Sequence, residues 1–293
     1  MDINSLKAFI KVAEEGSFSL AGESLHLTQP AISKRIAVLE SELGTRLFDR
    51  IGRQVSLTEG GRALLPRAQR MLDEVADIRR SLASLKGEVA GTLSMGTSHH
   101  IGLRRLPPIL RQFSKQYPEV QLDIRFMDSE SACSAVEQGR LELGVVTLPT
   151  RPAPNLKLIP LWEDPLYFVV SPDHPLSDLP QPSLEALARH QAVLPGMGTY
   201  TREILEQALA PKGIQIQTGM STNYLETLKM LVSIGLGWSL LPGTLIKGEK
   251  LCVLDIGELQ LSRTLGVVQH RRRTLSNAAR AMLENCQANT QQG

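Results

Sequence analysis

Residues 17–44 read SFSLAGESLHLTQPAISKRIAVLESELG, and this stretch decides the fold of the first part of the chain. Ser17 is placed to cap a short helix. Thr28 is placed to cap a second helix, which has Pro30 in its first turn and ends at Gly44. Apolar residues in this second helix recur at steps of four, three and four: Ile32, Ile36, Leu39 and Leu43. That spacing predicts one core-facing stripe.

The opposite face of the second helix carries small polar and basic side chains, Gln29, Ser33 and Lys34. Residues 2–15 also show helical apolar spacing, so a further helix precedes the pair. Two short helices joined by so tight a turn, with such an outer face, indicate a helix-turn-helix. An ordinary three-helix cluster with a solvated face has the same pattern, so both interpretations stay open.

Residues 46–58, RLFDRIGRQVSLT, follow directly and are typical of a β-wing. A turn at Gly52 lies between Arg50 and Arg53, and a strand of alternating apolar residues comes after it. An arginine-tipped wing suits the phosphate backbone or the narrow minor groove of DNA, and this strengthens the helix-turn-helix interpretation.

The most regular apolar pattern of the chain follows Thr58, which is placed to cap another helix. The apolar residues step alternately by four and three: Leu64, Ala68, Met71, Val75, Ile78, Leu82 and Leu85. An a/d seam of this kind predicts a long helix that pairs with a second copy of the chain. A surface helix packed on its own domain is the alternative. Pro66 lies inside the pattern and should bend or loosen the first turns.

The run from about residue 2 to residue 65 resembles the N-terminal domain of LysR-type transcriptional regulators. Three motifs carry the resemblance: L-T-Q-P-A-I-S at 27–33, L-E-x-x-L-G-x-x-L-F at 39–48 and L-T-x-x-G at 57–61. Gly22 departs from the family, which usually has Ala there, and should soften the second helix. Lys34 stands where Arg is common, so a point-charge contact replaces a bidentate one.

The resemblance implies a dyad promoter site read by paired helices, and a tetramer in which the effector domains make a second contact. The residues expected to contact DNA are Thr28, Gln29, Pro30, Ser33, Lys34 and Arg53. The helix face should enter the major groove, while Arg53 should contact the backbone. The expected partners are double-stranded promoter DNA, further copies of the chain as a homodimer or homotetramer, and RNA polymerase.

A second region follows a hinge predicted at residues 88–91. Its first series holds strands at 92–97, 120–126 and 143–147, with helices up to Tyr117 and at 130–138. After Pro149–Pro154, a second series holds strands at 156–161, 166–170, 192–194, 214–219, 238–241 and 265–268, and helices at 201–210, 223–234 and through Leu283. Alternating strands and helices indicate a parallel sheet covered by helices.

Two such series predict a two-lobed α/β domain with a cleft, and the resemblance implies the same: an effector-binding domain similar to a periplasmic binding protein. The expected fold class is therefore α plus α/β, with a winged helix-turn-helix, a long linker helix and a two-lobed effector domain. The expected boundaries are 1–62 for DNA binding, 63–90 for the dimerisation helix and 91–293 for effector binding, with lobe I at about 91–161 and 265–293 and lobe II at about 162–264.

Ligands of open α/β sheets bind where strands end and helices begin, because free amide hydrogens and the helix dipole gather there. The residues at such places are Thr97, Ser98, His99, Ser129, Thr147, Thr199, Thr201 and Asn223. No fixed cation is apparent among them, so we expect a small effector with one carboxylate or similar anionic group, held by neutral donors. A neutral polar metabolite is the alternative. His99 adds a pH-dependent charge, although each of these residues could be a plain helix cap.

Other classes of protein find little support. The six histidines lack zinc-ligand spacing, and the G-x-S-x-G and G-x-x-x-x-G-K-[ST] motifs are absent, so we expect no enzyme activity, metal or cofactor. Three scattered cysteines indicate reduced thiols. No apolar run approaches the roughly 20 residues of a membrane span, and no signal peptide is apparent, so we expect a cytoplasmic protein.

Three points stay open. The formal net charge of +2 identifies no partner by itself. The alternative function is a solute-binding module without a DNA role, because two thirds of the chain has that architecture, although the segment 1–62 counts against it. The run Arg271–Arg273 is expected to be a solvated turn, or else to hold a neighbouring subunit or DNA.

Overall fold

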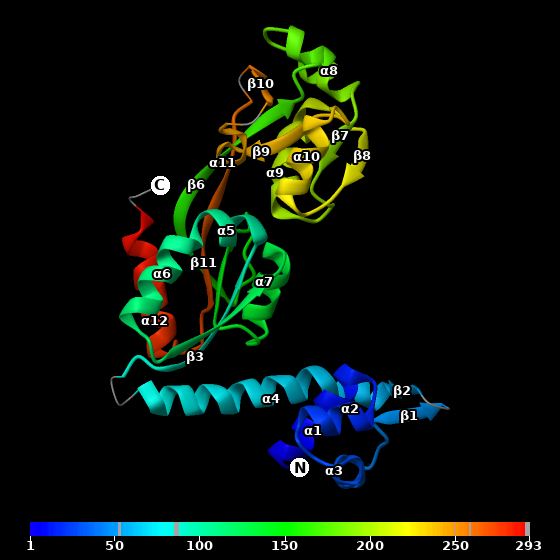
Figure 1. Ribbon diagram of the computed structural model, residues 1–293. Helices are drawn as coiled ribbons and strands as arrows, with labels where there is room; N and C mark the ends of the chain where they lie inside the picture. The colour runs from blue at the N-terminus through cyan, green and yellow to red at the C-terminus, as the bar shows by residue number, and fades with distance from the viewer. Residues whose placement is uncertain (52–53, 85–87, 249, 258, 291–293) are drawn as a thin grey trace. The chain divides into compact units, whose positions relative to one another are not determined.

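The computed structural model describes residues 1–51, 54–84, 88–248, 250–257 and 259–290 of the chain (Figure 1). The chain forms two compact units, Met1–Ala83 and Ser84–Gly293. None of the helices in the described ranges is long and apolar enough to cross a membrane.

The first unit opens with three helices, α1 (Ile3–Glu15), α2 (Phe18–Ser24) and α3 (Gln29–Leu43). The predicted caps are confirmed. The hydroxyl of Ser17 accepts a hydrogen bond from the Leu20 amide, and that of Thr28 accepts one from the Ala31 amide. Gly44 ends α3 in the left-handed conformation that glycine adopts without strain. Local hydrogen bonding thus fixes where α2 and α3 begin.

The three helices share one apolar core with aromatic rings at its centre. The rings of Phe9 and Phe18 lie 5.4 and 5.7 Å from that of Phe48, measured between centroids. The predicted stripe of α3 is buried at three positions, Ile32, Ile36 and Leu39. Leu43, its fourth member, is exposed because the core ends one turn before the helix does.

The turn between α2 and α3 depends on a close approach at Gly22. The Leu27 amide donates to the Gly22 carbonyl over 2.8 Å, and His26 between them has a positive φ of 54°. A Cβ at position 22 would lie 2.7 Å from the Leu27 carbonyl oxygen. Besides any softening of α2, the missing side chain of Gly22 makes room for the turn.

The predicted wing is present as β1 (Phe48–Ile51) paired antiparallel with β2 (Gln54–Leu57). Its tip, Gly52 and Arg53, lies outside the described residues. The next helix is α4 (Glu59–Ser84), and the Thr58 hydroxyl accepts from the Gly61 amide at its start, as predicted. The fold of this unit is thus a winged helix-turn-helix continued by a long helix.

The apolar seam of α4 divides into two parts. Near the start of the helix, Leu64 and Ala68 pack into the core of their own unit. Further along, Met71 and Ile78 are 46% and 52% exposed. Leu85 lies outside the described residues. Packing on its own domain therefore accounts for the first turns of α4 but leaves later apolar positions uncovered.

One large sheet forms the centre of the second unit. Its strands are β3 (Gly91–Thr97), β4 (Val120–Phe126), β5 (Leu143–Thr147), β6 (Leu156–Val170), β9 (Ser239–Pro242), β10 (Cys252–Leu254) and β11 (Leu261–His270). The order is β10-β6-β11-β5-β3-β4, and β9 also pairs with β6. The strands β3, β4 and β5 are parallel, as predicted, whereas β11 runs antiparallel to β5 and β6.

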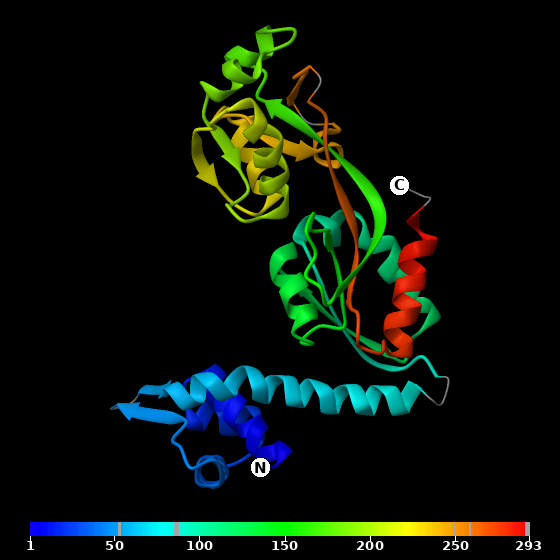
Figure 2. The same cartoon turned by 180° about the vertical axis from the view of Figure 1, so that it is seen from behind.

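Lobe I consists of β3, β4 and β5 with four helices: α5 (His99–Arg104), α6 (Leu106–Gln116), α7 (Ser129–Glu137) and α12 (Asn277–Ala288). Figure 2 shows α6 and α12 on one face of the sheet and α7 on the other. Alternate strand residues serve the two faces: Val145 packs under α6 and α12, and Val146 packs under α7. Helices therefore cover both faces of the parallel strands, although the edge strand β4 has no fully buried residue.

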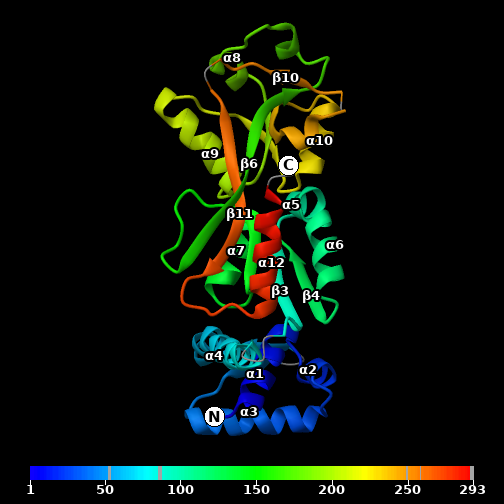
Figure 3. The same ribbon diagram turned by 90° about the vertical axis from the view of Figure 1, so that its left-hand side faces the viewer.

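Lobe II holds β9, β10 and a separate parallel pair, β7 (Ala192–Leu194) and β8 (Thr218–Ser221). Its helices are α8 (Leu184–Ala188), α9 (Tyr200–Leu209), α10 (Leu225–Ser233) and α11 (Gly243–Ile246), with 3₁₀ turns η1 (Pro175–Asp178) and η2 (Ala210–Lys212). Trp238 is fully buried in its core beside Phe168 of β6. Figure 3 shows β6 and β11 running side by side from one lobe into the other.

Two predicted strands, 156–161 and 166–170, form the single strand β6. Pro160 lies opposite Gly266, where the register shifts and Leu161 of β6 is the extra residue. A Cβ at Gly266 would lie 2.3 Å from the Ile159 carbonyl oxygen, so glycine permits the close pairing there. The strand predicted at 214–219 is also wrong. Thr218–Ser221 forms β8, and Ile214 packs against the core of lobe II from irregular chain.

The arginine run has an internal role. Arg271 donates from Nε to the Leu156 carbonyl over 2.9 Å. Arg273 donates from Nη1 to the carbonyls of Gly139 and Leu141 over 2.7 and 3.0 Å. The run forms an exposed turn, as predicted, but the side chains of Arg271 and Arg273 also tie loops of lobe I together.

The packing at Gly22 gives a first testable prediction. Gly22→Ala should lower the free energy of unfolding of the first unit by about 1 kcal/mol or more. The clash with a backbone carbonyl outweighs the helix propensity of alanine, which favours it by about 1 kcal/mol. Thermal unfolding of the full chain measures the change. Ser19→Ala, at an exposed position of the same helix, is the control and should not destabilise. Equal or greater stability of Gly22→Ala would contradict the packing described.

Candidate functional site

The outer face of α3 is the first candidate site. Thr28, Gln29, Pro30 and Lys34 are exposed, and Ser33 is partly exposed. The Gln29 side-chain amide donates to the Ser33 hydroxyl over 2.8 Å, one helical turn away. Lys34 forms no ion pair with any residue that the structure describes. The face therefore presents a pre-oriented amide and a cation to an external partner. Arg53, the sixth residue predicted here, lies outside the described residues.

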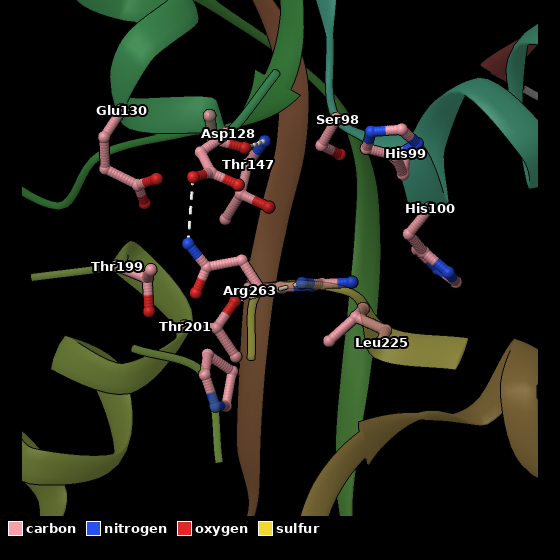
Figure 4. A pocket seen from close by; sticks show the side chains of 13 residues that line it. Ser98, His99, His100, Asp128, Glu130, Thr147, Thr199, Thr201, Leu225 and Arg263 are labelled. Carbon is pink, nitrogen blue, oxygen red and sulfur yellow. Dashed lines mark hydrogen bonds between the residues drawn. The ribbon is translucent and has the colours of Figure 1, made fainter. Parts of the chain in front are cut away.

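The second candidate site is a cleft in the second unit, with a volume of about 490 Å³ that includes space open to solvent. The residues that line it are Ser98, His99, His100, Asp128, Ser129, Glu130, Thr147, Pro195, Thr199, Thr201, Asn223, Leu225 and Arg263. They come from the ends of strands and the starts of α5, α7, α9 and α10, and from β11 (Figure 4). Both lobes therefore contribute to one cleft.

The structure brings together seven of the eight predicted effector residues. Ser98, His99, Ser129, Thr147, Thr199, Thr201 and Asn223 all line the cleft. Thr97 does not. It is fully buried, and its hydroxyl donates to the Val145 carbonyl over 2.9 Å, so it holds two neighbouring strands together.

The cleft contains a fixed cation that the sequence analysis missed. Arg263 is 5% exposed and pairs with Asp164, which is 1% exposed, with Nη2 2.8 Å from the carboxylate oxygen Oδ2. Its Nε donates to the same oxygen over 2.9 Å, and its Nη1 donates to the Thr201 hydroxyl over 3.0 Å. Although Nη2 is close to Asp164, it makes no hydrogen bond of acceptable geometry within the described structure. A buried guanidinium thus keeps unused donor capacity.

A sequence signal for this arginine did exist. Leu261, Arg263 and Leu265 alternate along β11, so Arg263 occupies an inward-facing position between two apolar residues. A charge at such a position needs a buried partner. That partner, Asp164, stands 99 residues earlier in the chain, and no local pattern links the two residues.

Two carboxylates join the lobes across the cleft. Asp128 accepts a hydrogen bond over 2.9 Å from the side-chain amide of Asn223. Glu130 accepts one over 2.6 Å from the backbone amide of Tyr200. Burial raises the pKa of Glu130, and the nearby charges of Asp128 and Glu203 raise it further. Asp128 stands with Ser129 at a strand end where the sequence predicts ligand contacts, but neither acid is among the predicted effector residues, because acids at a helix start resemble ordinary helix-start residues.

Some hydroxyl groups in the cleft already make hydrogen bonds within the protein, and others do not. Ser129 accepts from the Thr147 amide over 3.1 Å, and Thr199 donates to the Gly196 carbonyl over 2.8 Å. Thr201 accepts from Arg263, as described above. The hydroxyls of Ser98 and Thr147 make no hydrogen bond to any described residue. These two hydroxyls are therefore available to a ligand.

The two adjacent histidines have different environments. The ring of His99 lies 5.3 Å from that of Phe126 and 4.8 Å from that of Tyr224, between centroids. His100 is buried, with Nε2 3.2 Å from the Thr244 hydroxyl of lobe II. Burial lowers the pKa of His100 to about 3, and the positive charges of Arg263, Arg104 and Arg105 contribute. His100 is therefore neutral at physiological pH.

In the described part of the chain, no three His, Cys, Asp or Glu side chains are grouped so that they could hold a metal ion. The thiols of Cys133 and Cys286 are buried, and burial raises their pKa values to about 11 and about 12. A thiol with so high a pKa is a poor nucleophile at neutral pH.

The environment of His100 predicts how stability depends on pH. Below about pH 6.5 the unfolded chain binds a proton at His100 that the folded chain rejects until about pH 3. The free energy of unfolding that comes from keeping His100 neutral is therefore fully present above pH 6.5, and it decreases as the pH falls below 6.5. Between pH 6.5 and pH 5, the free energy of unfolding should fall by about 2 kcal/mol because of this one histidine.

Chemical denaturation of the full chain at pH 7.5 and pH 5 measures this contribution. The His100→Gln variant should lose less stability on acidification than the unsubstituted chain, by about 2 kcal/mol. His270→Gln changes a histidine outside the cleft and should behave like the unsubstituted chain. An equal acid-induced loss in the His100→Gln variant would show that His100 is not held neutral by its surroundings.

Comparisons with known proteins agree with this architecture. A family model described as the bacterial regulatory helix-turn-helix protein of the lysR family matches residues 3–62, and one described as the LysR substrate binding domain matches residues 86–291. An uncharacterised HTH-type transcriptional regulator in the ibpB-leuC intergenic region of Azotobacter vinelandii is 68% identical over 108 residues, which are 37% of this chain and 75% of that protein.

Two further relatives match nearly the whole chain. The RuBisCO operon transcriptional regulator of Allochromatium vinosum is 30% identical over 97% of this chain and 95% of its own length. Full-length CbnR, solved in complex with its target DNA, has the same fold with a TM-score of 0.69 and 22% identity, covering 99% of this chain and 100% of that one. The chain therefore belongs to the LysR family of DNA-binding transcriptional regulators and carries the effector-binding domain of that family.

Proposed function

We propose that this regulator binds a dyad promoter site through paired α3 helices, and that a small effector with an anionic group binds in the cleft and controls it. The observation that carries the effector proposal is Arg263, a buried guanidinium with unused donor capacity where the two lobes meet. In this proposal, residues 1–62 bind DNA, residues 63–90 form the dimerisation helix and residues 91–293 bind the effector.

The proposed DNA contacts divide into two kinds. Gln29, Ser33 and Lys34 read base edges in the major groove, and Thr28 and Pro30 set the angle at which α3 enters it. The hydrogen bond between Gln29 and Ser33 supports this role, because it holds the glutamine amide in one orientation before DNA arrives. Arg53 contacts phosphates from the wing and adds affinity without sequence preference.

We infer that the chain acts by binding and not by catalysis. Two groups in the cleft that would be candidates for catalysis are already engaged: the Ser129 hydroxyl accepts from a backbone amide, and His100 is held neutral beside Thr244. A nucleophile needs a neighbouring base that can take its proton. The ligand is therefore a signal, which acts through a different affinity for different arrangements of the lobes.

The proposed assembly is a homotetramer built from two kinds of contact. Exposed apolar side chains on α4, Met71 and Ile78, support pairing of that helix with a second copy. In lobe II, Met230 and Ile234 at the end of α10 are 46% and 62% exposed, which supports a second contact between effector domains. The proposed location is the cytoplasm, and RNA polymerase is the proposed protein partner at the promoter.

The DNA proposal is tested by substitution in α3 and the wing. Gln29→Ala or Ser33→Ala should relax base preference, because a good base contact is worth about 1–3 kcal/mol. Arg53→Ala should weaken binding similarly on all sequences and reduce the slope of log affinity against log salt by about one unit. Gel shifts on matched and mutated sites at several salt concentrations measure both effects.

Ser41→Ala is the control for these substitutions, since Ser41 is exposed on α3 beyond its first turns and should leave DNA affinity unchanged. An altered base preference in the Arg53→Ala variant with an unchanged salt slope would contradict the assignment of the wing to the backbone.

The assembly proposal is tested at the seam of α4. Val75→Asp or Ile78→Asp would place an unpaired charge between two helices, which is unfavourable by several kcal/mol. Sedimentation should then show monomers or smaller oligomers, and promoter binding should weaken. Ile78→Leu keeps an apolar side chain and should preserve assembly. An unchanged size with full DNA binding in the Asp variants would refute the seam.

A further inference from the structure

The charges around the cleft do not balance. Arg263 is neutralised by Asp164, with which it forms a buried ion pair. Asp128 and Glu130 add two more carboxylates to the lining, and neither makes an ion pair with any residue that the structure describes. His100 is neutral and contributes no compensating charge. The cleft therefore has excess negative charge on the side of α7.

Burial concerns Glu130 alone, because Asp128 is exposed. Glu130 is partly enclosed, and its pKa is raised by burial and by the charges of Asp128 and Glu203. Each carboxylate accepts only one hydrogen bond from the other lobe, to Asn223 and Tyr200 respectively. A carboxylate oxygen can accept two hydrogen bonds, so both groups keep acceptor capacity. A cationic donor at this place would satisfy it and relieve the repulsion.

A second region of the cleft has the opposite character. Arg263 lines this region with a 95% buried side chain, whose Nη2 is enclosed 2.8 Å from Asp164 Oδ2, so it contributes positive charge near the cleft but not an open donor. The unengaged hydroxyls of Ser98 and Thr147 line the same cleft. In Figure 4, Asp128 and Glu130 lie on one side, and the guanidinium of Arg263 lies towards Ser98 and His100 on the other. This second region suits a carboxylate.

We propose that the cleft binds a small zwitterion, an α-amino acid or a close derivative, with its ammonium group at Asp128 and Glu130 and its carboxylate at Ser98, Thr147 and Arg263. This inference rests on the proposed effector function and narrows its ligand. A ligand with carboxylates alone would add negative charge beside two uncompensated acids. An amine alone would leave the hydroxyls of Ser98 and Thr147 without an acceptor.

The experiment compares three matched series on the full chain by calorimetry: the common L-amino acids, the 2-hydroxy acids that lack the ammonium group, and the primary amines that lack the carboxylate. At least one amino acid should bind about tenfold or more tightly than both of its counterparts, since a charge-assisted contact is worth about 1.5–3 kcal/mol. An absence of binding by every amino acid overturns the proposal.

Substitutions locate the two groups of the ligand. Asp128→Asn and Glu130→Gln keep an acceptor for Asn223 and Tyr200, so they should fold normally. Each should weaken the amino acid about tenfold while leaving its hydroxy-acid counterpart unchanged or strengthened. Glu137→Gln lies on the same helix outside the cleft and should change neither affinity. Ser98→Ala should weaken both compounds alike.

The outcomes separate this proposal from the one on which it rests. A hydroxy acid that binds as tightly as the amino acid, with an affinity that depends on Ser98 but not on Asp128 or Glu130, overturns the zwitterion and leaves the anionic effector standing. An amino acid whose affinity is unchanged by substitutions at Ser98, Asp128 and Glu130 has bound elsewhere, which overturns both proposals.

Discussion

The ion pair between Arg263 and Asp164 is the interaction on which the second unit depends. The two residues are directly opposite in the antiparallel pairing of β11 with β6, and both side chains are buried. Removal of one partner from such a pair leaves an uncompensated buried charge, which destabilises by about 3–5 kcal/mol. A slip of one residue would turn every side chain to the other face. The pair therefore favours a single register of the two strands that join the lobes.

The same pair connects stability to recognition. Because Asp164 engages one side of the guanidinium and Thr201 another, only part of the group remains for a ligand, and its direction is fixed. A rigid donor loses little entropy on binding. The carboxylates facing it are held by hydrogen bonds from lobe II, so the geometry of the cleft changes when the lobes move. Ligand selectivity and lobe arrangement are thus coupled through the same few contacts.

Local signals in the sequence were enough to predict much of the fold. The caps at Ser17 and Thr28, the stripe of α3 and the parallel strands β3 to β5 each depend on neighbouring residues, and each is confirmed. Seven hydroxyl, amide and imidazole residues of the cleft were predicted for the same reason, because strand ends and helix starts are visible in sequence.

What the sequence could not predict depends on residues that meet only in the folded chain. The role of Gly22 depends on the Leu27 carbonyl, which lies close to it only in the folded turn. In the same way, Pro160 of β6 pairs with Gly266 of β11, where a side chain would clash with the neighbouring Ile159 carbonyl. The Arg263–Asp164 pair spans 99 residues. Without that partner in view, a cation in the cleft cannot be inferred from the local pattern.

The pairing of β6 with β11 also bears on how this domain could have evolved. Trp162 and Leu265 are register partners, so the chain leaves lobe I and returns to it at adjacent points of one sheet. Lobe II is in that sense an insertion within a β-hairpin of lobe I. A short turn could close the same hairpin without disturbing the remaining strands, since insertions are best tolerated where the chain ends lie together. Lobe II could accordingly be exchanged or diversified as a unit, while lobe I keeps its core.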